Sequence, residues 1–557
     1  MISMKPKIII LGFLLFLVIV FGFYLKTTLS THIVFGDEGF HVRLSQLIAE
    51  NREYMTWFGT NLDKTGFGRP PLFNILQASF LFVFGFHESI IKILTPFIAV
   101  MTGLALFLLA KKLYNIRIGL LSSITLVTLP SFVTYSVLFY TDILFTFYTT
   151  LFILLFLLYI KDDNRKYLML SAIFASLAFL TKITSVIFLA FVALSFVYLL
   201  ARMKTWPKIK IFREAFIFTV IFLFFTSPFL LRNFYYYQTA LCDTPLPFFD
   251  NFGCYMSDFE QKYKFPPRSG EGQGTESSLL RFGLSNFINF AYGGWSDNVG
   301  PLKFIYKILT PFANSLTQFT GLAFSSLFLI MGLLGGVIIL AIKREHIGIL
   351  LLTLLALIFI VIYQAKYRTE DTARHILSWA PFLAILSSVY WNEVYRFLNR
   401  FYKYLGMAII VLVLLIGLQN LTSKLSAMES VKQFSPLFFE ACDWVKENLS
   451  KDSMLMTFWG YRAGYNCQRH VSSGYADIRL SNDPEYMSDF AKQHGVTHFF
   501  IQKFSIRPEA ARETYSIEFV KLLEDNPEYF EKVYENGPPL ENCFTQVCDG
   551  NIIYKLV

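Results

Sequence analysis

The sequence has little charge for its length. Of 557 residues only 16% are charged, while 54% are hydrophobic. Soluble domains carry about 25% charged and about 45–50% apolar residues. The apolar residues also come in runs about 20 residues long, which is the length that spans a bilayer. This shortage of charge excludes an ordinary soluble protein and predicts a polytopic α-helical membrane protein.

Several signatures of common chemistries are missing. Only 8 histidines occur, and His87-Glu88 is followed by Ile91 where a zincin helix has its second histidine. There is no Walker-type phosphate loop and no dinucleotide fingerprint. The net charge of +9 comes from short basic clusters between the apolar runs, not from a basic stripe interleaved with aromatic residues. We therefore expect no nucleic-acid partner and no required cofactor, and a divalent metal is unsupported.

The apolar runs predict about 11 transmembrane helices. The first, Ile8 to Tyr24, is long enough to span and no small-residue cleavage site follows it, which favours a signal anchor over a cleaved signal peptide. The other runs are Ile93 to Ala110, Ile118 to Val137, Ile143 to Ile160, Tyr167 to Leu180, Ile183 to Leu200, Phe216 to Leu231, Leu322 to Ile342, Ile347 to Gln364, Ile376 to Trp391 and Tyr404 to Leu418.

Every second loop between these runs is rich in Lys and Arg, which places those loops and the N-terminus on the cytoplasmic side. The run Leu72 to Phe86 is short for a span, and we predict an interfacial or re-entrant helix there. Residues 26–92, residues 233–316 and everything after 421 then lie outside the cytoplasm. We expect the plasma membrane, although the same topology suits the endoplasmic reticulum.

All six cysteines fall in the segments assigned to the outside, as expected of disulfides in an oxidising compartment. Proximity in the sequence favours Cys242–Cys254 and Cys543–Cys548, which leaves Cys442–Cys467. Six unrelated thiols are the alternative.

Residues 422–557 return to ordinary polarity and predict a separate extracytoplasmic domain beside the membrane domain of residues 1–421. Ser435-Pro436 is typical of a helix start, and strand-like runs occur at Met454 to Trp459, Thr497 to Gln502 and Ile552 to Leu556. Alternating helices and strands predict a small α/β unit.

Acidic residues next to membrane spans are rare and are candidates for function. Asp37 and Glu38 follow the first apolar run, and Asp142 stands at the outer end of the fourth. The plainer interpretation is a helix cap, solvated in the case of Asp37 and ordinary in the case of Asp142. The predicted topology, however, brings Asp37 and Asp142 to one outer face.

Three basic positions also stand at outer helix ends, where cations are disfavoured. Arg69 precedes Pro70-Pro71, which hold the backbone extended up to the next helix, and the others are Lys182 and Arg374-His375. A guanidinium near the headgroups can bind a phosphate in a bidentate manner. The alternative for each cation is a long side chain that snorkels to the interface.

In their order and spacing these motifs resemble the GT-C membrane glycosyltransferases, over roughly residues 8–420. The acidic pair, the Arg-Pro-Pro-Leu run, Thr141-Asp142, Thr181-Lys182 and Arg374-His375 before a proline-containing helix are most similar to the branch of protein O-mannosyltransferases (dolichyl-phosphate-mannose-protein mannosyltransferases) and aminoarabinose transferases. The resemblance implies a GT-C-like helical fold and an inverting transferase that takes a sugar from a polyprenyl-phosphate carrier on the outer face.

By this resemblance Asp37 matches the catalytic aspartate and Asp142 the second acidic position. Arg69 stands where the family often has Lys or His, and Lys182 is similar to the Thr-Lys position. Gly68 departs from the aminoarabinose branch, where an acidic residue helps to bind metal. Phe458-Trp459-Gly460-Tyr461 replaces the Trp-Trp-Asp of oligosaccharyltransferases, which argues against en-bloc transfer to asparagine.

The expected mechanism uses Asp37 as general base, with Glu38 and Asp142 orienting the reactants. Arg69, Lys182 and Arg374 would stabilise the departing phosphate of the donor. The partners would be a polyprenyl-phosphate-linked sugar, an acceptor hydroxyl on lipid, glycan or protein, and the bilayer. The main alternative is a non-enzymatic flippase or transporter of lipid-linked glycans, and a receptor or assembly role for the C-terminal domain ranks last.

Overall fold

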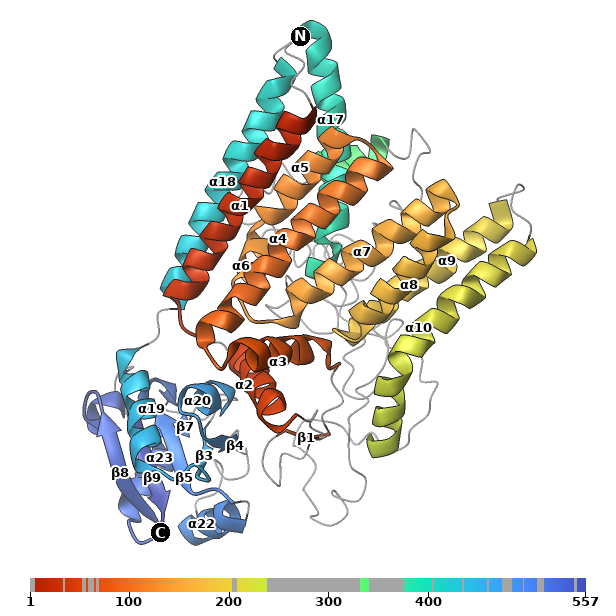
Figure 1. Ribbon diagram of the computed structural model, residues 1–557. Coiled ribbons are helices and arrows are strands. Elements are labelled where there is room, and N and C mark those ends of the chain that lie inside the picture. The colour runs from red at the N-terminus through yellow and green to blue at the C-terminus, as the bar shows by residue number, and fades with distance from the viewer. Residues whose placement is uncertain are drawn as a thin grey trace, which may run out of the picture. The chain divides into compact units, whose positions relative to one another are not determined.

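The computed structural model (Figure 1) describes residues 6–33, 36–52, 57–58, 65–66, 70–202, 208–237, 331–339, 374, 376–402, 405–432, 435–457, 460–472, 483–493, 495–507, 515–544 and 548–557. These residues fall into two compact units. Unit 1 comprises residues 1–28, 68–73 and 92–428, and unit 2 comprises residues 29–67, 74–91 and 429–557. The predicted division at residue 421 takes no account of the two N-terminal segments of unit 2, and its assignment to membrane and extracytoplasmic domains stays a prediction.

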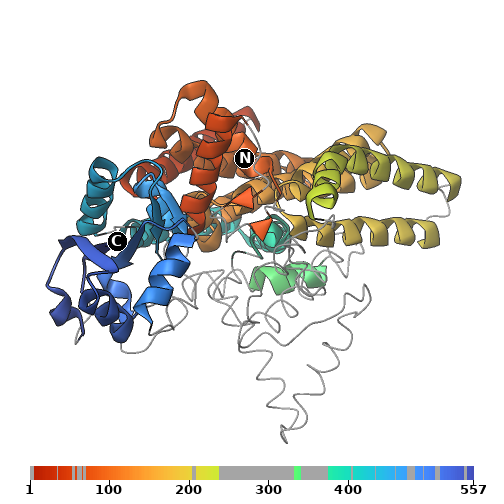
Figure 2. The same ribbon diagram turned by 90° about the horizontal axis from the view of Figure 1, so that it is seen from below.

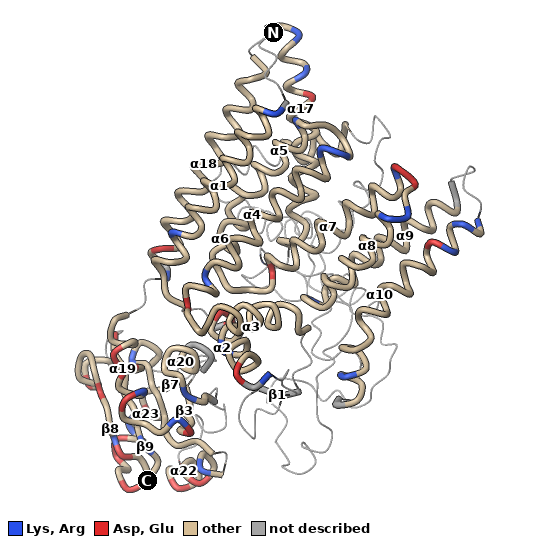
Figure 3. Tube along the Cα trace, viewed as in Figure 1, with Lys and Arg blue, Asp and Glu red and all other residues tan. Residues whose placement is uncertain are grey.

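The long helices belong mainly to unit 1. Charged residues are sparse along them and gather near their ends and in the C-terminal part of the chain (Figure 3). The helices are α1 (Pro6–Ser30), α4 (Glu88–Leu113), α5 (Ile116–Val127), α6 (Pro130–Ser136), α7 (Thr141–Asp162), α8 (Arg165–Phe179), α9 (Val186–Arg202), α10 (Lys208–Tyr237), α17 (Ala380–Phe401) and α18 (Leu405–Val431), with short 3₁₀ turns η1 (Ile183–Ser185) and η2 (Leu377–Trp379).

Among the described residues, six helices are long and apolar enough to cross a membrane, or seven if α5 and α6 form one bent span. The span predicted over Ile118 to Val137 is broken, because the chain bends by 63° between α5 and α6. Pro130 begins α6, and proline cannot donate the hydrogen bond that would continue α5. The chain is thus a multi-span helical protein, as predicted, and the count of 11 spans stays a prediction.

Two of the predicted spans are not among the helices that are long and apolar enough to cross a membrane. Helix α8 has 15 residues, which at 1.5 Å per residue is shorter than a bilayer core of about 30 Å. Helix α17 has 22 residues but ends in a polar stretch. The runs at 322–342 and 347–364 lie almost wholly outside the described residues. Helix α3 (Leu72–Phe84) has 13 residues, too few to span.

Unit 1 is held together by aromatic packing between helices. Helix α8 packs on both α7 and α10 (Figure 1). Phe156 on α7 meets the rings of Phe191 and Phe218, which belong to α9 and α10. Trp379 is fully buried, with its ring 4.3 Å from that of Phe188. These contacts hold α7, α9 and α10 together and place η2 against α9.

Unit 2 contains a five-stranded mixed sheet, coloured blue in Figures 1 and 2, in the order β4-β3-β5-β9-β8. Strands β4, β3 and β5 are parallel, whereas β9 is antiparallel to both β5 and β8. The strands of this sheet are β3 (Met454–Met456), β4 (His470–Ser472), β5 (His498–Gln502), β8 (Phe530–Asn536) and β9 (Asn551–Leu556). Strands therefore form near all three positions where the hydrophobic pattern predicted them.

Further short elements complete unit 2. Ser435 caps α19 by accepting a hydrogen bond from the backbone N–H of Leu437, so that helix begins as predicted. The other elements are α2 (Gly36–Asn51), α3, α19 (Pro436–Asn448), α20 (Gly460–Asn466), α22 (Pro484–Gln493), α23 (Ile517–Asp525), the short strands β1 (Trp57–Phe58), β2 (Thr65–Gly66), β6 (Ile506–Arg507) and β7 (Tyr515–Ser516), and the 3₁₀ turns η3 (Lys503–Ser505) and η4 (Leu540–Phe544).

Two of the three predicted disulfides are confirmed. Cys442 on α19 is joined to Cys467, and Cys543 is joined to Cys548. The third predicted pair, Cys242–Cys254, lies outside the described residues. The disulfide at Cys442 is buried within an apolar cluster that also contains Phe438 and Phe500.

Candidate functional site

Asp142 stands in the first turn of α7 with its side chain only 1% exposed. Its two carboxylate oxygens each meet a different cation. Oδ1 lies 2.6 Å from Nζ of Lys182, and Oδ2 lies 2.8 Å from Nε of Arg374. The helix-cap interpretation of Asp142 is wrong, because Tyr140 occupies the N-cap position and the carboxylate is used for the two ion pairs.

Three segments of unit 1 bring these residues together. Lys182 follows α8 in extended backbone just before η1, and Arg374 precedes η2. Both α8 and η2 pack on α7. The guanidinium of Arg374 also lies over the ring of Tyr140, 4.4 Å from its centroid, a cation–π arrangement. We call Asp142, Lys182 and Arg374 the ion triad.

The triad changes the interpretation of its two cations. The side chains of Lys182 and Arg374 are 17% and 16% exposed, and both pair with the buried carboxylate of Asp142 instead of extending into solvent. Two cations and one carboxylate carry a formal charge of +1 in a largely dehydrated place. Electrostatic interactions are stronger there than in water, and buried charges need close partners. The arrangement is suited to binding an anion.

The Arg-Pro-Pro segment leads into this region. Arg69 itself lies outside the described residues. Pro70 and Pro71 precede α3, and the backbone N–H of Leu72 donates to the carbonyl of Leu180 at 2.9 Å. Leu180 is two residues before Lys182, so the start of α3 is tied to the turn that carries a triad cation.

The acidic pair lies in the first turn of α2, which belongs to unit 2. Asp37 is half-buried and is inside the helix, so it is not a solvated cap. Glu38 is fully buried, and its Oε1 lies 2.9 Å from Nζ of Lys432. Lys432 was not among the predicted site residues, because a lysine shortly after the last apolar run is typical of an ordinary boundary charge.

A buried polar network joins α2 to α3. The Nδ1 atom of His41 lies 3.2 Å from Oδ1 of Asn74, whose amide donates to the His41 carbonyl. Ser45 donates to Oε1 of Gln77 at 2.8 Å. Because buried polar groups are costly unless they are paired, these bonds specify how α2 lies on α3.

The six predicted site residues are therefore distributed over two units. Asp142, Lys182 and Arg374 meet in unit 1, whereas Asp37 and Glu38 belong to unit 2. The expectation that Asp37 and Asp142 share one outer face stays a prediction, as do the roles assigned to all six residues.

The two buried carboxylates among the candidate residues, Asp142 and Glu38, both face cations. Both oxygens of Asp142 face cations, and Glu38 faces Lys432. Within the described ranges no group of three or more His, Cys, Asp or Glu side chains could hold a metal ion.

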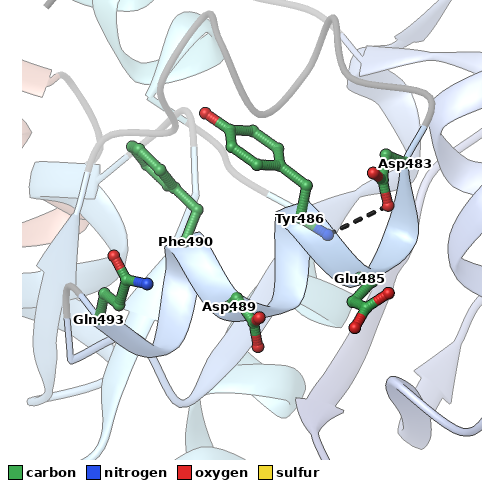
Figure 4. A pocket seen from close by; sticks show the side chains of 6 residues that line it. All are labelled: Asp483, Glu485, Tyr486, Asp489, Phe490 and Gln493. Atoms are coloured by element: carbon green, nitrogen blue, oxygen red, sulfur yellow. Dashed lines mark hydrogen bonds between the residues drawn. The ribbon is translucent and has the colours of Figure 1, made fainter.

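One described pocket, of about 310 Å³, lies on α22, away from these candidates in the sequence. It is lined by Asp483, Glu485, Tyr486, Asp489, Phe490 and Gln493, all from one helix and the residue that precedes it (Figure 4). Asp483 accepts a hydrogen bond from the backbone N–H of Tyr486 at 3.1 Å. Its carboxylate thus caps the helix, and the pocket is a hollow beside one helix surface.

Comparison with known proteins supports the resemblance. Residues 68–231 match the family model of dolichyl-phosphate-mannose-protein mannosyltransferase. This segment includes Arg69, Asp142 and Lys182, but neither Asp37 nor Arg374. No curated protein sequence matches the chain.

Solved structures share the fold at low sequence identity. The apo oligosaccharyltransferase of Archaeoglobus fulgidus is 13% identical, with 95% of this chain and 80% of that chain covered and a TM-score of 0.59. ArnT from Cupriavidus metallidurans bound to undecaprenyl phosphate is 12% identical, with 99% of each chain covered and a TM-score of 0.57. AglB from A. fulgidus, in complex with an inhibitory peptide and a dolichol-phosphate, is 14% identical over 88% of this chain and 69% of that chain, with a TM-score of 0.56.

The comparisons agree with the resemblance drawn from the motifs: the chain is similar to the protein mannosyltransferases over residues 68–231 and to ArnT in its fold.

Proposed function

We propose that this protein is an inverting glycosyltransferase. It moves a sugar from a polyprenyl-phosphate carrier to an acceptor hydroxyl on the extracytoplasmic face of the membrane. In this proposal the protein lies in the plasma membrane and crosses it about 11 times. Its N-terminus is cytoplasmic and its C-terminal domain is extracytoplasmic. The reaction requires no cofactor.

The ion triad is the observation that carries this proposal. A lone Lys–Asp pair would be neutral, but the second cation leaves the three side chains with a formal charge of +1 at the outer end of α7. A phosphate monoester anion is a suitable partner for such a cluster. Two similar structures contain such a lipid: ArnT is bound to undecaprenyl phosphate and AglB to a dolichol-phosphate. Both support a lipid phosphate as the anion.

In the proposed reaction the oxygen of the acceptor hydroxyl attacks the anomeric carbon. The bond between that carbon and the phosphate oxygen breaks, and its electron pair leaves with the polyprenyl phosphate. Asp37 accepts the hydroxyl proton during attack, an effect of about 10²–10⁴-fold for a well-placed base. A single displacement inverts the anomeric configuration.

Lys182 and Arg374 act on the leaving group, together with Arg69. As the bond breaks, negative charge grows on the phosphate, and fixed cations that await it lower the barrier. Asp142 holds Lys182 and Arg374 in place, so that they need not reorganise when the charge develops. Glu38 does not contact the acceptor, because it is buried against Lys432.

Release of free polyprenyl phosphate tests the proposal. Purified protein is given a panel of labelled polyprenyl-phosphate sugars and membrane extract as the source of acceptor. We expect release that depends on the acceptor, and loss of that release in Asp37→Asn. Asp443→Asn is the matched control, because Asp443 is exposed and forms a surface pair with Lys446.

Two results would contradict the proposal. Full turnover in Asp37→Asn would exclude that residue as base. Binding of the lipid without release, even with acceptor present, would instead favour the flippase or transporter, and the fold would then be shared without the chemistry.

A further inference from the structure

Among the ion pairs between described residues of unit 2, the one between Glu38 and Lys432 is the most deeply buried. The side chains of Glu38 and Lys432 are 0% and 1% exposed, and Nζ of Lys432 donates to Oε1 of Glu38 at 2.9 Å. Charges leave water at a high cost, which is offset only by a close partner in good geometry. The pair therefore helps to hold both residues in place.

This pair also restrains Asp37, because Asp37 and Glu38 are neighbours in the chain. Glu38 is the next residue on the first turn of α2, and Lys432 lies 394 residues away, between α18 and α19. The pair thus fixes the helix turn that carries Asp37 to the start of the C-terminal segment of unit 2. A displacement of about 1 Å in a reacting group can cost about 10²-fold in rate.

Other contacts hold the same region from the same side. Helix α2 packs on α20 (Figure 1). The amide of Asn466 donates to the carbonyl of Ile33 at 3.2 Å, and the hydroxyl of Tyr465 donates to Oε2 of Glu88 at 3.1 Å. Cys467, which follows Asn466 in the chain, is linked to α19 by a disulfide. The C-terminal segment thus forms a support on which α2 rests.

We propose that Lys432 is a positioning residue for the transfer reaction: its buried ion pair with Glu38 holds the first turn of α2, and so the carboxylate of Asp37, in register for the acceptor. This inference rests on the proposed function. It assigns Glu38 to the support of the site and not to contact with substrate.

Steady-state kinetics of the full-length enzyme test the inference, with Lys432→Met, Glu38→Gln and the double variant. Each single change removes one member of the buried ion pair, and we expect kcat to fall about 10-fold or more. The KM for the donor should stay within about twofold, because the proposed donor cations do not include Lys432. The double variant removes both charges and should recover most of kcat, as replacement of both members of a buried pair is often tolerated.

Lys446→Met is the matched control, since Lys446 forms an exposed pair within one helix turn, and it should leave kcat unchanged. Hydrogen exchange of the α2 amides shows whether the first turn loosens in the single variants while the sheet stays protected. If Lys432→Met fails to fold, Glu38→Gln and the double variant give the same comparison.

Different results would contradict the positioning role of Lys432 and the proposed transferase activity. Unchanged kcat in both single variants, with Asp37→Asn inactive, would overturn the role of Lys432 and leave the transferase proposal intact. Loss of kcat in the singles without recovery in the double variant would also overturn it, since the pair would then be needed for more than mutual neutralisation. Full activity in Asp37→Asn would overturn the proposed function itself.

Discussion

Arg374 and Asp142 are separated by 232 residues, yet Nε of Arg374 donates to Oδ2 of Asp142 at 2.8 Å. Lys182 occupies the other carboxylate oxygen. The carboxylate that the sequence offered as a helix cap is therefore the anchor of two cations from distant parts of the chain. This relationship ties the stability of the N-terminal end of α7 to the cations proposed to bind the donor phosphate.

The first prediction concerns the stability of the triad. Asp142→Asn leaves two nearly buried cations facing a neutral amide, and loss of one partner of a buried ion pair costs about 3–5 kcal/mol. We expect a clearly lower midpoint in thermal unfolding of the purified full-length protein. Asp443→Asn breaks a surface pair that contributes at most about 1 kcal/mol, so its midpoint should change little. Equal midpoints for the two variants would contradict a structural role for Asp142.

The second prediction concerns phosphate affinity. Lys182→Gln and Arg374→Gln each remove a charged donor, and hydrogen bonds to charged groups contribute about 1.5–3 kcal/mol. We expect the Kd for polyprenyl phosphate in nanodiscs to rise about 10- to 100-fold in each variant.

Lys210→Gln is the control for this measurement, because Lys210 pairs with Asp163 at the opposite end of α7. A Kd that rises as much in Lys210→Gln as in the triad variants would show that the loss is a general effect of removing charge.

The third prediction compares the two disulfides. Cys442–Cys467 closes a segment of 25 residues, whereas Cys543–Cys548 closes one of only 5. A longer closed loop restricts the unfolded chain more, and a loop of this size is expected to contribute about 3 kcal/mol. Cys442→Ser/Cys467→Ser should therefore accelerate limited proteolysis of residues 429–557 more than Cys543→Ser/Cys548→Ser does. The reverse order would show that the loop-length argument does not hold here.

The fourth prediction concerns pH. Burial of His498, helped by Lys555, lowers the pKa of this histidine to about 4, from about 6.5 in an unfolded chain. The folded state thus keeps the ring neutral where the unfolded state is protonated. The contribution of the neutral His498 to the free energy of unfolding is complete above about pH 7. It is lost as the pH falls from 6.5 toward 4.

Hydrogen exchange of the β5 amides in the full-length protein measures this loss of stability. Protection should fall over that range, and less steeply in His498→Gln, with Lys555→Gln intermediate because it removes only the weaker cause. Identical pH dependence in wild type and His498→Gln would contradict the assignment.

Local patterns were sufficient for many elements of the fold. The run over Ile143 to Ile160 lies within α7, and Ser435-Pro436 begins α19. The strand predicted at Thr497 to Gln502 is β5, which is buried along its whole length. Each of these depends on residues that are neighbours in the sequence: an apolar run, a cap, or a short β-rich segment. The bend at Pro130 was missed because the hydrophobic run continues through it.

The sequence by itself determined that the chain belongs in a membrane, and it singled out Asp142, Lys182 and Arg374, because charge among apolar runs is costly and therefore conspicuous. Only the tertiary structure decided that these three meet around one carboxylate and that Glu38 is paired with Lys432. The reason is physical: an ion pair depends on distances of a few ångströms in space, and packing sets those distances between residues tens to hundreds of positions apart.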